Sequence, residues 1–346
     1  MEQNKQQKND DNLTTFRHKI WITTGIVAFT AVLLLIFKAT FSVFLLVFAG
    51  TLIAVFFRGI SSFIQKKTSW NEGLSVAISI IGTLLIVAGL FLLIGAKVQA
   101  QAAELIDTLP KSIENVRDRL NDSSIGQKFI ERATSKDSMD KAQGFLGQFF
   151  KSTFGILGDV YVILFIGIFF TVSPDTYVNG LIQLIPKKGQ DKARQISDKM
   201  NSQLFNWLKG KLFAMFVVFV LTAIGLAIIG MPLWLVLALF AGLISFVPNF
   251  GPLISLIPAV LVALMQSPLT AAMVTGLYIL VQFLESNFIT PLVQKKLINT
   301  PLALIIISQL IMGVLTGGWG LILATPLLVL VIVTVQELYL KKNSTR

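Results

Sequence analysis

FVPNFGP, at residues 246–252, lies in the middle of an apolar stretch, 232–266, that carries no charged side chain. Proline, asparagine and glycine favour turns, so the stretch predicts a hairpin of two helical arms around this tip. The first arm, 233–247, would be about 22 Å long as a helix, whereas the hydrocarbon core of a bilayer is about 30 Å thick. We therefore expect a re-entrant hairpin, with two short, tilted spans as the alternative. The tip residues expected to matter are Pro248, Asn249, Gly251 and Pro252.

A second apolar stretch, 301–335, repeats this layout. Both stretches open with Pro-Leu, and each reaches a glycine nineteen residues after that proline, at Gly251 and Gly320. The spacing indicates an internal repeat, although glycine and proline are common enough in membrane helices for it to arise without one. If the segment between the hairpins, 268–295, crosses the membrane once, they enter from opposite faces, as in inverted-repeat transporters. The hinge residues expected in the second hairpin are Gly317, Gly318, Gly320 and Pro326.

The composition is that of a membrane protein. Of 346 residues, 54% are hydrophobic and 14% are charged, which leaves a polytopic membrane protein as the class that fits. The net charge of +11 lies mostly in short loops beside apolar segments, as the positive-inside rule predicts, so it indicates no nucleic-acid partner. There is no cysteine, and the one histidine, His18, lies outside the apolar segments, so no disulfide and no histidine-based metal or catalytic site is expected.

Enzyme motifs are also missing from the sequence. It contains no zincin motif, nucleophile elbow or P-loop. We therefore expect a protein that is not an enzyme and holds no metal and no cofactor, and whose transport is secondary or passive. Coupling to H+ or Na+ is compatible with this composition.

The order of polar and apolar segments predicts an all-α polytopic membrane protein with about eight membrane segments, two of them the Gly/Pro-tipped hairpins. The predicted parts are a cytoplasmic tail (1–19), three spans (20–96), an extracytoplasmic helical insert (97–151), a fourth span (152–172), a cytoplasmic amphipathic segment (173–211), a transport core (212–338) and a cytoplasmic tail (339–346). The first tail is polar enough to be disordered, and a tight turn at Lys38 separates the first two spans.

Two charged segments interrupt the spans. The insert is either a gate or cap over a substrate path, or a solvated spacer that packs on its own neighbours. In 192–208, four apolar residues recur at helical spacing, which is typical of an interfacial helix. These residues are Ile196, Met200, Leu204 and Leu208.

Basic residues set the orientation. The first tail, the loop at 58–67, the segment 173–211, Lys295-Lys296 and Lys341-Lys342 fall on one side of the predicted spans. The positive-inside rule places that side in the cytoplasm, so both termini are expected there and the insert faces outward.

Glu285 is the lone acid in the apolar part of 268–295. It stands ten residues before Lys295, about 15 Å along a helix, and an ionisable group at that depth marks a functional site by default. Gln282 and Tyr278 precede it by one and about two turns on the same face, so this stripe can bind or titrate a cation. The structural alternative is that Glu285 stays neutral or caps backbone amides at a hairpin tip.

Other polar residues in apolar surroundings have both functional and structural readings. Asn249, at a helix break, can coordinate an ion or a polar solute together with freed backbone groups, or can serve only as a turn residue. Gln309 is expected to hydrogen-bond across helices, and Asp159 to be hydrated near the outer boundary. The glycines at 317–320 suit close helix packing or a hinge.

Three motifs resemble the AI-2E family of bacterial transporters. FVPNFGP with Ile-Pro-Ala at 257–259 is similar to that family's Pro-x-x-Gly-Pro…Ile-Pro-Ala signature. Residues 282–293, QFLESNFITPLV, resemble its Glu-x-Asn-x-x-x-Pro segment, which brings in Asn287 as a candidate. The glycines at 317–320 with Ala-Thr-Pro-Leu at 324–327 resemble its C-terminal turn. Asn249 departs from the pattern, where an aromatic residue is more usual, and this leaves substrate preference open.

The resemblance implies a bacterial inner-membrane permease that forms homo-oligomers, pentamers among them, with mobile hairpins and membrane lipids around it. Family members are associated with export of autoinducer-2, and others resemble sodium(lithium)/proton antiporters. Our leading hypothesis is a secondary transporter or exporter of a small hydrophilic solute, whose path is lined near Asn249 and Gly318. The alternative is a Na+(Li+)/H+ antiporter in which Glu285 is the cation or proton group. A third hypothesis is a membrane scaffold that acts through the insert.

Overall fold

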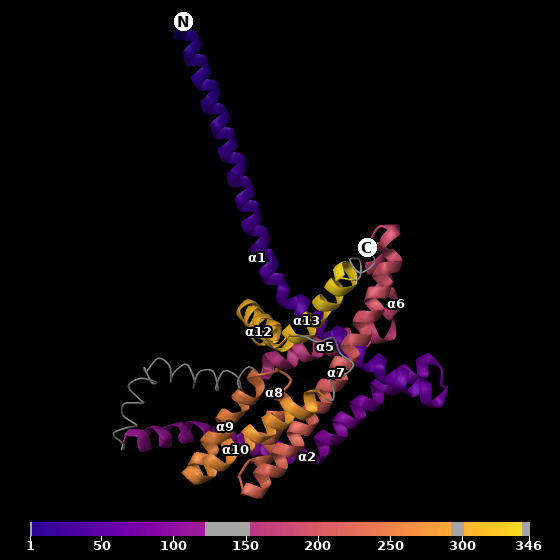
Figure 1. Cartoon of the computed structure of the whole chain (residues 1–346), viewed down its shortest axis with the longest axis vertical. Coiled ribbons are helices and arrows are strands. Elements are labelled where there is room, and N and C mark those ends of the chain that lie inside the picture. The colour runs from indigo at the N-terminus through magenta and orange to yellow at the C-terminus, as the bar shows by residue number, and fades with distance from the viewer. Residues whose placement is uncertain (1, 122–152, 292–300, 341–346) are drawn as a thin grey trace.

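The computed structural model describes residues 2–121, 153–291 and 301–340, and every regular element in these residues is helical (Figure 1). The elements are α1 (Glu2–Thr68), α2 (Glu72–Asn121), α5 (Thr153–Val172), α6 (Pro174–Gln183), α7 (Lys187–Ile229), α8 (Trp234–Ile244), α9 (Phe250–Gln266), α10 (Pro268–Leu284), the π-helix η1 (Glu285–Ile289), α12 (Leu302–Thr316), α13 (Gly318–Val335) and the π-helix η2 (Gln336–Leu340). The all-α polytopic class is thus confirmed.

Length and apolar composition give five membrane-spanning candidates in the described part of the chain, and a sixth if α5 and α6, which meet at a bend of 85°, count as one span. The expected number of about eight is not confirmed, because the arms α8, α9 and α12 are apolar but too short to qualify. Whether the two hairpins are re-entrant therefore stays a prediction.

Helix α1 corrects two expectations about the N-terminus. The turn predicted at Lys38 is absent, because α1 runs unbroken through this position, and the tail expected to be disordered is the first part of the same helix. The reason lies in the residues: no proline occurs in α1, and no glycine lies between Gly25 and Gly50, so nothing interrupts the hydrogen-bond ladder. The N-terminal half of α1 projects away from the body of the molecule (Figure 1).

Two more helices are longer than the sequence pattern predicted. Helix α2 joins the third span to the start of the insert and passes through Pro110; the remainder of the insert, from 122 to 151, lies outside the described residues. The start of the insert packs on the transport core, where Leu105 is buried and Gln101 Oε1 accepts the backbone N–H of Val236 at 3.1 Å.

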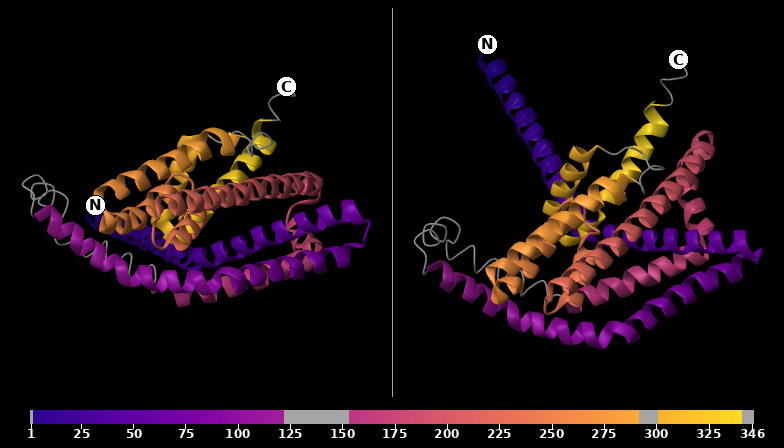
Figure 2. Two further views of the ribbon diagram at one scale, coloured as in Figure 1. Left: turned by 90° about the horizontal axis from the view of Figure 1, so that it is seen from below. Right: turned by 60° about the horizontal axis from the view of Figure 1, so that its bottom comes forward.

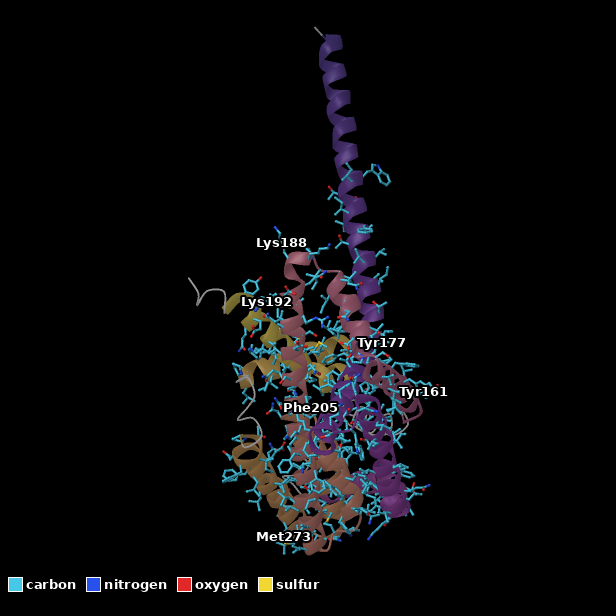
Figure 3. All side chains as sticks on the ribbon, turned by 90° about the vertical axis from the view of Figure 1, so that its right-hand side faces the viewer. Tyr161, Tyr177, Lys188, Lys192, Phe205 and Met273 are labelled. Atoms are coloured by element: carbon cyan, nitrogen blue, oxygen red, sulfur yellow. The ribbon has the colours of Figure 1, made fainter. Side chains whose placement is uncertain are left out.

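Helix α7 joins the predicted interfacial segment to the fifth span. Its face of Ile196, Leu204 and Leu208 is buried, with Met200 half-buried, and Leu204 and Leu208 pack on α1 and α13 inside the protein. The interfacial reading is therefore wrong: the apolar face packs on helices. Figure 3 shows how far α7 reaches, with Lys188, Lys192 and Phe205 at successive levels along it.

Both predicted hairpins exist, and their breaks fall where the sequence placed them. In hairpin 1 (α8 and α9), the chain turns through Asn249, whose φ is +66°. In hairpin 2 (α12 and α13), it turns at Gly317, with φ +65° and ψ −136°, a region open to glycine. Gly251 and Gly320 let the arms approach, since a Cβ there would lie 2.2 Å from the Ile244 carbonyl oxygen and 2.1 Å from that of Met312.

Two apolar cores hold these elements together. One collects buried side chains from α2, α7, α8, α9 and α10, among them Leu226, Leu237, Ala263 and Val274. The other joins α1, α5, α7 and α13 through residues such as Leu45, Trp207 and Val333. Helix α7 contributes to both cores; α8 and α10 pack against it, and α10 runs alongside its second half (Figures 1 and 2).

Candidate transport site

A cavity of about 360 Å³ lies between α7, the tip of hairpin 1, the junction of α10 with η1, and hairpin 2. Its lining mixes one acid, one lysine and several neutral polar side chains with apolar ones. The lining residues are Trp207, Gly210, Lys211, Ala214, Ser245, Pro248, Asn249, Pro252, Gln282, Glu285, Ser286, Thr290, Leu302, Ile305 and Thr325. We call this space the central cavity.

Glu285 forms an ion pair with Lys211 on the wall of the central cavity. The Lys211 Nζ atom lies 3.4 Å from Glu285 Oε1, and the side chains are only 11% and 9% exposed. Opposite charges removed from water attract strongly because little solvent screens them, but each charge would be costly to leave without the other. The pair therefore stabilises two ionised groups next to a cavity, where a ligand can compete for either one.

The backbone at Glu285 is unusual as well. Helix α10 widens into the π-helix η1 at this residue, and the N–H of Thr290 donates to the carbonyl of Glu285, five residues back. Single π-turns inside α-helices are rare and frequently occur at functional sites. Gln282, at the end of α10, donates from its Nε2 to Ser286 Oγ in η1 at 2.9 Å, so two further cavity residues are held in place by each other.

The tip of hairpin 1 is held by hairpin 2. Gln309 of α12 is fully buried, and its Nε2 donates to the carbonyl of Pro248 at 3.0 Å. This confirms the predicted hydrogen bond between helices. Farther along hairpin 2, Thr325 points its hydroxyl into buried surroundings beside the cavity, and that oxygen has no hydrogen-bond partner among the described residues.

The structure brings together only some of the residues chosen from the sequence. Glu285, Gln282 and Asn249 line the central cavity, together with Pro248 and Pro252 from the same tip. Asn287 does not: it is exposed, and its Nδ2 donates to the carbonyl of Phe283 on its own helix.

The remaining chosen residues lie outside the central cavity. Gly251 and Gly320 lie in the close approaches described above, while a Cβ at Gly317 or Gly318 would meet open space. Neither these residues nor Pro326, which is fully buried in α13, line the cavity. Tyr278, expected on the stripe with Glu285, is buried in the first apolar core instead.

Lys211 is the residue that the sequence reasoning missed. It had been counted with the basic cytoplasmic segment, yet it follows Trp207 and Leu208 and directly precedes the long apolar run that begins at Leu212. A lysine inside a helix with apolar residues on both sides is a signal of burial. Its pairing with an acid 74 residues away depends on tertiary structure.

Three other polar contacts tie the helices together. Glu337 of η2 is buried and pairs with both Lys192 and Lys199 of α7. Asp159 of α5, which was expected to be hydrated, instead accepts the indole N–H of Trp319 at 2.7 Å. The tip of hairpin 2 is thereby fastened to α5.

Comparison with known proteins adds an independent line of evidence. The AI-2E family transporter model matches residues 26–340. "Putative transport protein YueF" of Bacillus subtilis (strain 168) is 25% identical over 323 residues, which cover 85% of this chain and 87% of that protein. "Putative permease PerM" of Escherichia coli (strain K12) is 26% identical over 175 residues, or 50% of each chain. The resemblance drawn from the three motifs is confirmed.

Proposed function

The chain belongs to the AI-2E family of transporters, and from this premise we propose that it is a secondary transporter of a small hydrophilic solute, which it binds in the central cavity. The observation that carries the proposal is the buried Glu285–Lys211 pair on the wall of that cavity. Membrane transport itself follows from the family and from the apolar helices. The solute, its polarity and its place of binding are our inference.

The size and chemistry of the cavity support a solute larger than a bare ion. At about 360 Å³ it lies at the lower end of the roughly 300–1,000 Å³ usual for small-molecule sites. Asn249, Gln282 and Ser286 present donors and acceptors to it, and the Thr325 hydroxyl lacks a partner among the described residues. A solute with several hydroxyl, carbonyl or charged groups satisfies such a lining, and an autoinducer-2-like signal is of this class.

The direction of transport follows the family resemblance, and the orientation follows the charges in the sequence. We propose export across the bacterial inner membrane, as the resemblance implies. We place both termini in the cytoplasm because the basic segments share one side. We also propose a homo-oligomer, pentameric by the family resemblance, in which the two hairpins move relative to each other as the cavity opens.

The second candidate function is cation/proton antiport, and one observation favours it. Lys211 supplies an internal positive charge to Glu285, so a sodium or lithium ion that reaches the carboxylate must displace the ammonium group. Such competition couples the two charges: the cation binds when Lys211 moves away or loses its proton. Solute export and antiport thus use the same Glu285 carboxylate. They differ in whether a solute or a cation takes the place of the Lys211 ammonium group beside it.

Efflux from proteoliposomes tests the solute proposal. Vesicles with the full-length protein are loaded with labelled small polar solutes, autoinducer-2 among them, and Thr325→Val is compared with wild type. Losing one neutral hydrogen bond to the solute weakens binding by about 0.5–1.5 kcal/mol, or roughly two- to tenfold. Thr334→Val is the matched control, because that hydroxyl on the same helix bonds to the Leu330 carbonyl. Equal efflux for all three proteins would contradict a solute path through the cavity.

An internal pH dye tests the antiport candidate in the same vesicles. Sodium or lithium pulses should drive proton flux in wild type and none in Glu285→Gln. Glu104→Gln, which removes an exposed acid on α2, should leave the flux unchanged. Flux that persists in Glu285→Gln would exclude this carboxylate as the coupling group.

A further inference from the structure

A second large hollow lies between α1 and α7, away from the central cavity, with a volume of about 880 Å³. The two helices touch at its floor, where Gly59 meets Phe205 so closely that a Cβ on the glycine would lie 1.8 Å from the ring. Phe205 is labelled on α7 in Figure 3. We call this hollow the α1–α7 groove; its lining residues include Arg58, Ser62, Phe63, Lys66, Asn201, Ser202, Phe205, Asn206, Lys209, Leu212, Phe213 and Phe216.

The polar part of the groove is positive. Three cations line it, and none of the described lining residues is an acid. Arg58 is already engaged, because it pairs with Glu72 and donates to the Thr171 carbonyl at 2.6 Å. Lys66 and Lys209 are exposed, and no ion-pair partner for either exists among the residues that the structure describes. Two positive charges therefore remain for a ligand.

The rest of the groove is apolar and faces outward. Phe213 and Phe216 follow Lys209 on α7 by one and two turns and are 49% and 63% exposed. The stretches of both helices that form the groove belong to membrane-spanning candidates, Thr40–Thr68 and Lys187–Ile229. Exposed phenylalanines on such helices face hydrocarbon, whereas the lysines lie near the ends of the apolar runs, where headgroups are found.

We propose that the α1–α7 groove binds an anionic phospholipid, with its phosphate between Lys66 and Lys209 and an acyl chain along Phe213 and Phe216. Two lysines without an ion-pair partner among the described residues match a phosphate, and the aromatic wall matches a chain that no soluble anion possesses. Asn206 and Ser202 can donate to ester or phosphate oxygens. A second copy of the chain fits less well, because its basic residues outnumber its acidic ones by 29 to 18.

Native mass spectrometry of the detergent-purified full-length protein measures this binding with phosphatidylglycerol and phosphatidylcholine as probes. Wild type should retain phosphatidylglycerol in preference to phosphatidylcholine. Each basic residue near an anionic headgroup contributes about fivefold to affinity, so Lys66→Gln/Lys209→Gln should lower the preference by about twenty-fivefold. Lys66→Arg/Lys209→Arg, which keeps both charges, should preserve it and shows that the site tolerates substitution.

The matched control removes an equal charge from α7 alone, outside the groove. Lys187 and Lys188 are exposed in the first turn of α7 and lie outside the groove, so Lys187→Gln/Lys188→Gln should retain the wild-type preference. The proposal is overturned if this control loses as much preference as the groove variant, or if the groove variant loses none. It is also overturned if soluble glycerol phosphate displaces the lipid at equal concentration, since the apolar wall would then contribute nothing.

A last experiment tests whether a second copy of the chain occupies the groove. The chain contains no cysteine, so Ser202→Cys places a single thiol at the groove. Efficient disulfide cross-linking between copies in membranes would assign the groove to an interface and overturn the proposal. No cross-linking, together with protection of the thiol from a water-soluble maleimide by added phosphatidylglycerol, would support it.

Discussion

Removing one member of the Glu285–Lys211 pair should destabilise the protein much more than removing both. Lys211→Met leaves a buried carboxylate without its counter-charge, and Glu285→Gln leaves a buried ammonium group in the same position. The double variant leaves a methionine beside a glutamine, neither of them charged. A double-mutant cycle over these three variants therefore isolates the energy of the pair from the loss of each side chain.

The separation of the charges sets the magnitude. At 3.4 Å and an effective dielectric constant of about 20, two unit charges attract by about 5 kcal/mol. Part of that gain is offset by the cost of removing both groups from water, and breaking a buried pair from one side typically costs about 3–5 kcal/mol. We expect each single variant to lose about 3 kcal/mol and the double variant to lie near wild type, which makes the magnitude of the coupling energy about 6 kcal/mol.

Unfolding of the detergent-solubilised protein by SDS, followed by tryptophan fluorescence, measures these differences. Trp207 lines the same cavity and reports on its surroundings. The control cycle pairs Glu285→Gln with Lys209→Met. Lys209 is exposed and lies two residues before Lys211, so this cycle should give a coupling energy below about 0.5 kcal/mol. If Lys211→Met and Glu285→Gln prove additive, the two groups do not interact and the charge argument for the central cavity fails.

Two further substitutions test how the hairpins are built. Gln309→Leu removes the hydrogen bond to the Pro248 carbonyl and should lower the free energy of unfolding by about 1 kcal/mol; an unchanged midpoint in the SDS titration would mean that hairpin 2 does not hold the tip of hairpin 1. Gly251→Ala places a Cβ 2.2 Å from the Ile244 carbonyl oxygen and should cost about 1–3 kcal/mol, whereas Gly82→Ala, in open space on α2, should be neutral or stabilising. Equal melting temperatures for the two alanine variants would refute the close approach in hairpin 1.

The features that were predicted well depend on local chemistry. Proline lacks a backbone donor, and asparagine and glycine adopt positive φ more readily than other residues, so their clusters predicted the helix breaks at 246–252 and at 315–320. Polarity alone proved a poor guide to where helices end. Lys38 and the charged first half of α7 lie inside continuous helices, because a lysine preserves the backbone hydrogen bonds that only proline removes.

Only part of the candidate site was predicted from the sequence. Glu285, Gln282 and Asn249 were recognisable because polar residues in apolar surroundings are costly there. Lys211 was not recognised, because it stands beside Lys209 at the end of a basic segment and its partner comes from a distant helix. Asn287 is the opposite case, a residue that was predicted but does not line the cavity. The family motif suggested it as a site residue, but its side chain bonds to the backbone of its own helix.

Both buried acids of the C-terminal half, Glu285 and Glu337, are paired with lysines of one helix, α7. Lys192 and Lys211 are nineteen residues apart on that helix, a separation of about 28 Å, and no proline interrupts the stretch between them. A shift of α7 along its axis would therefore disturb both ion pairs at once. One uninterrupted helix thus joins the wall of the central cavity to the end of the last span.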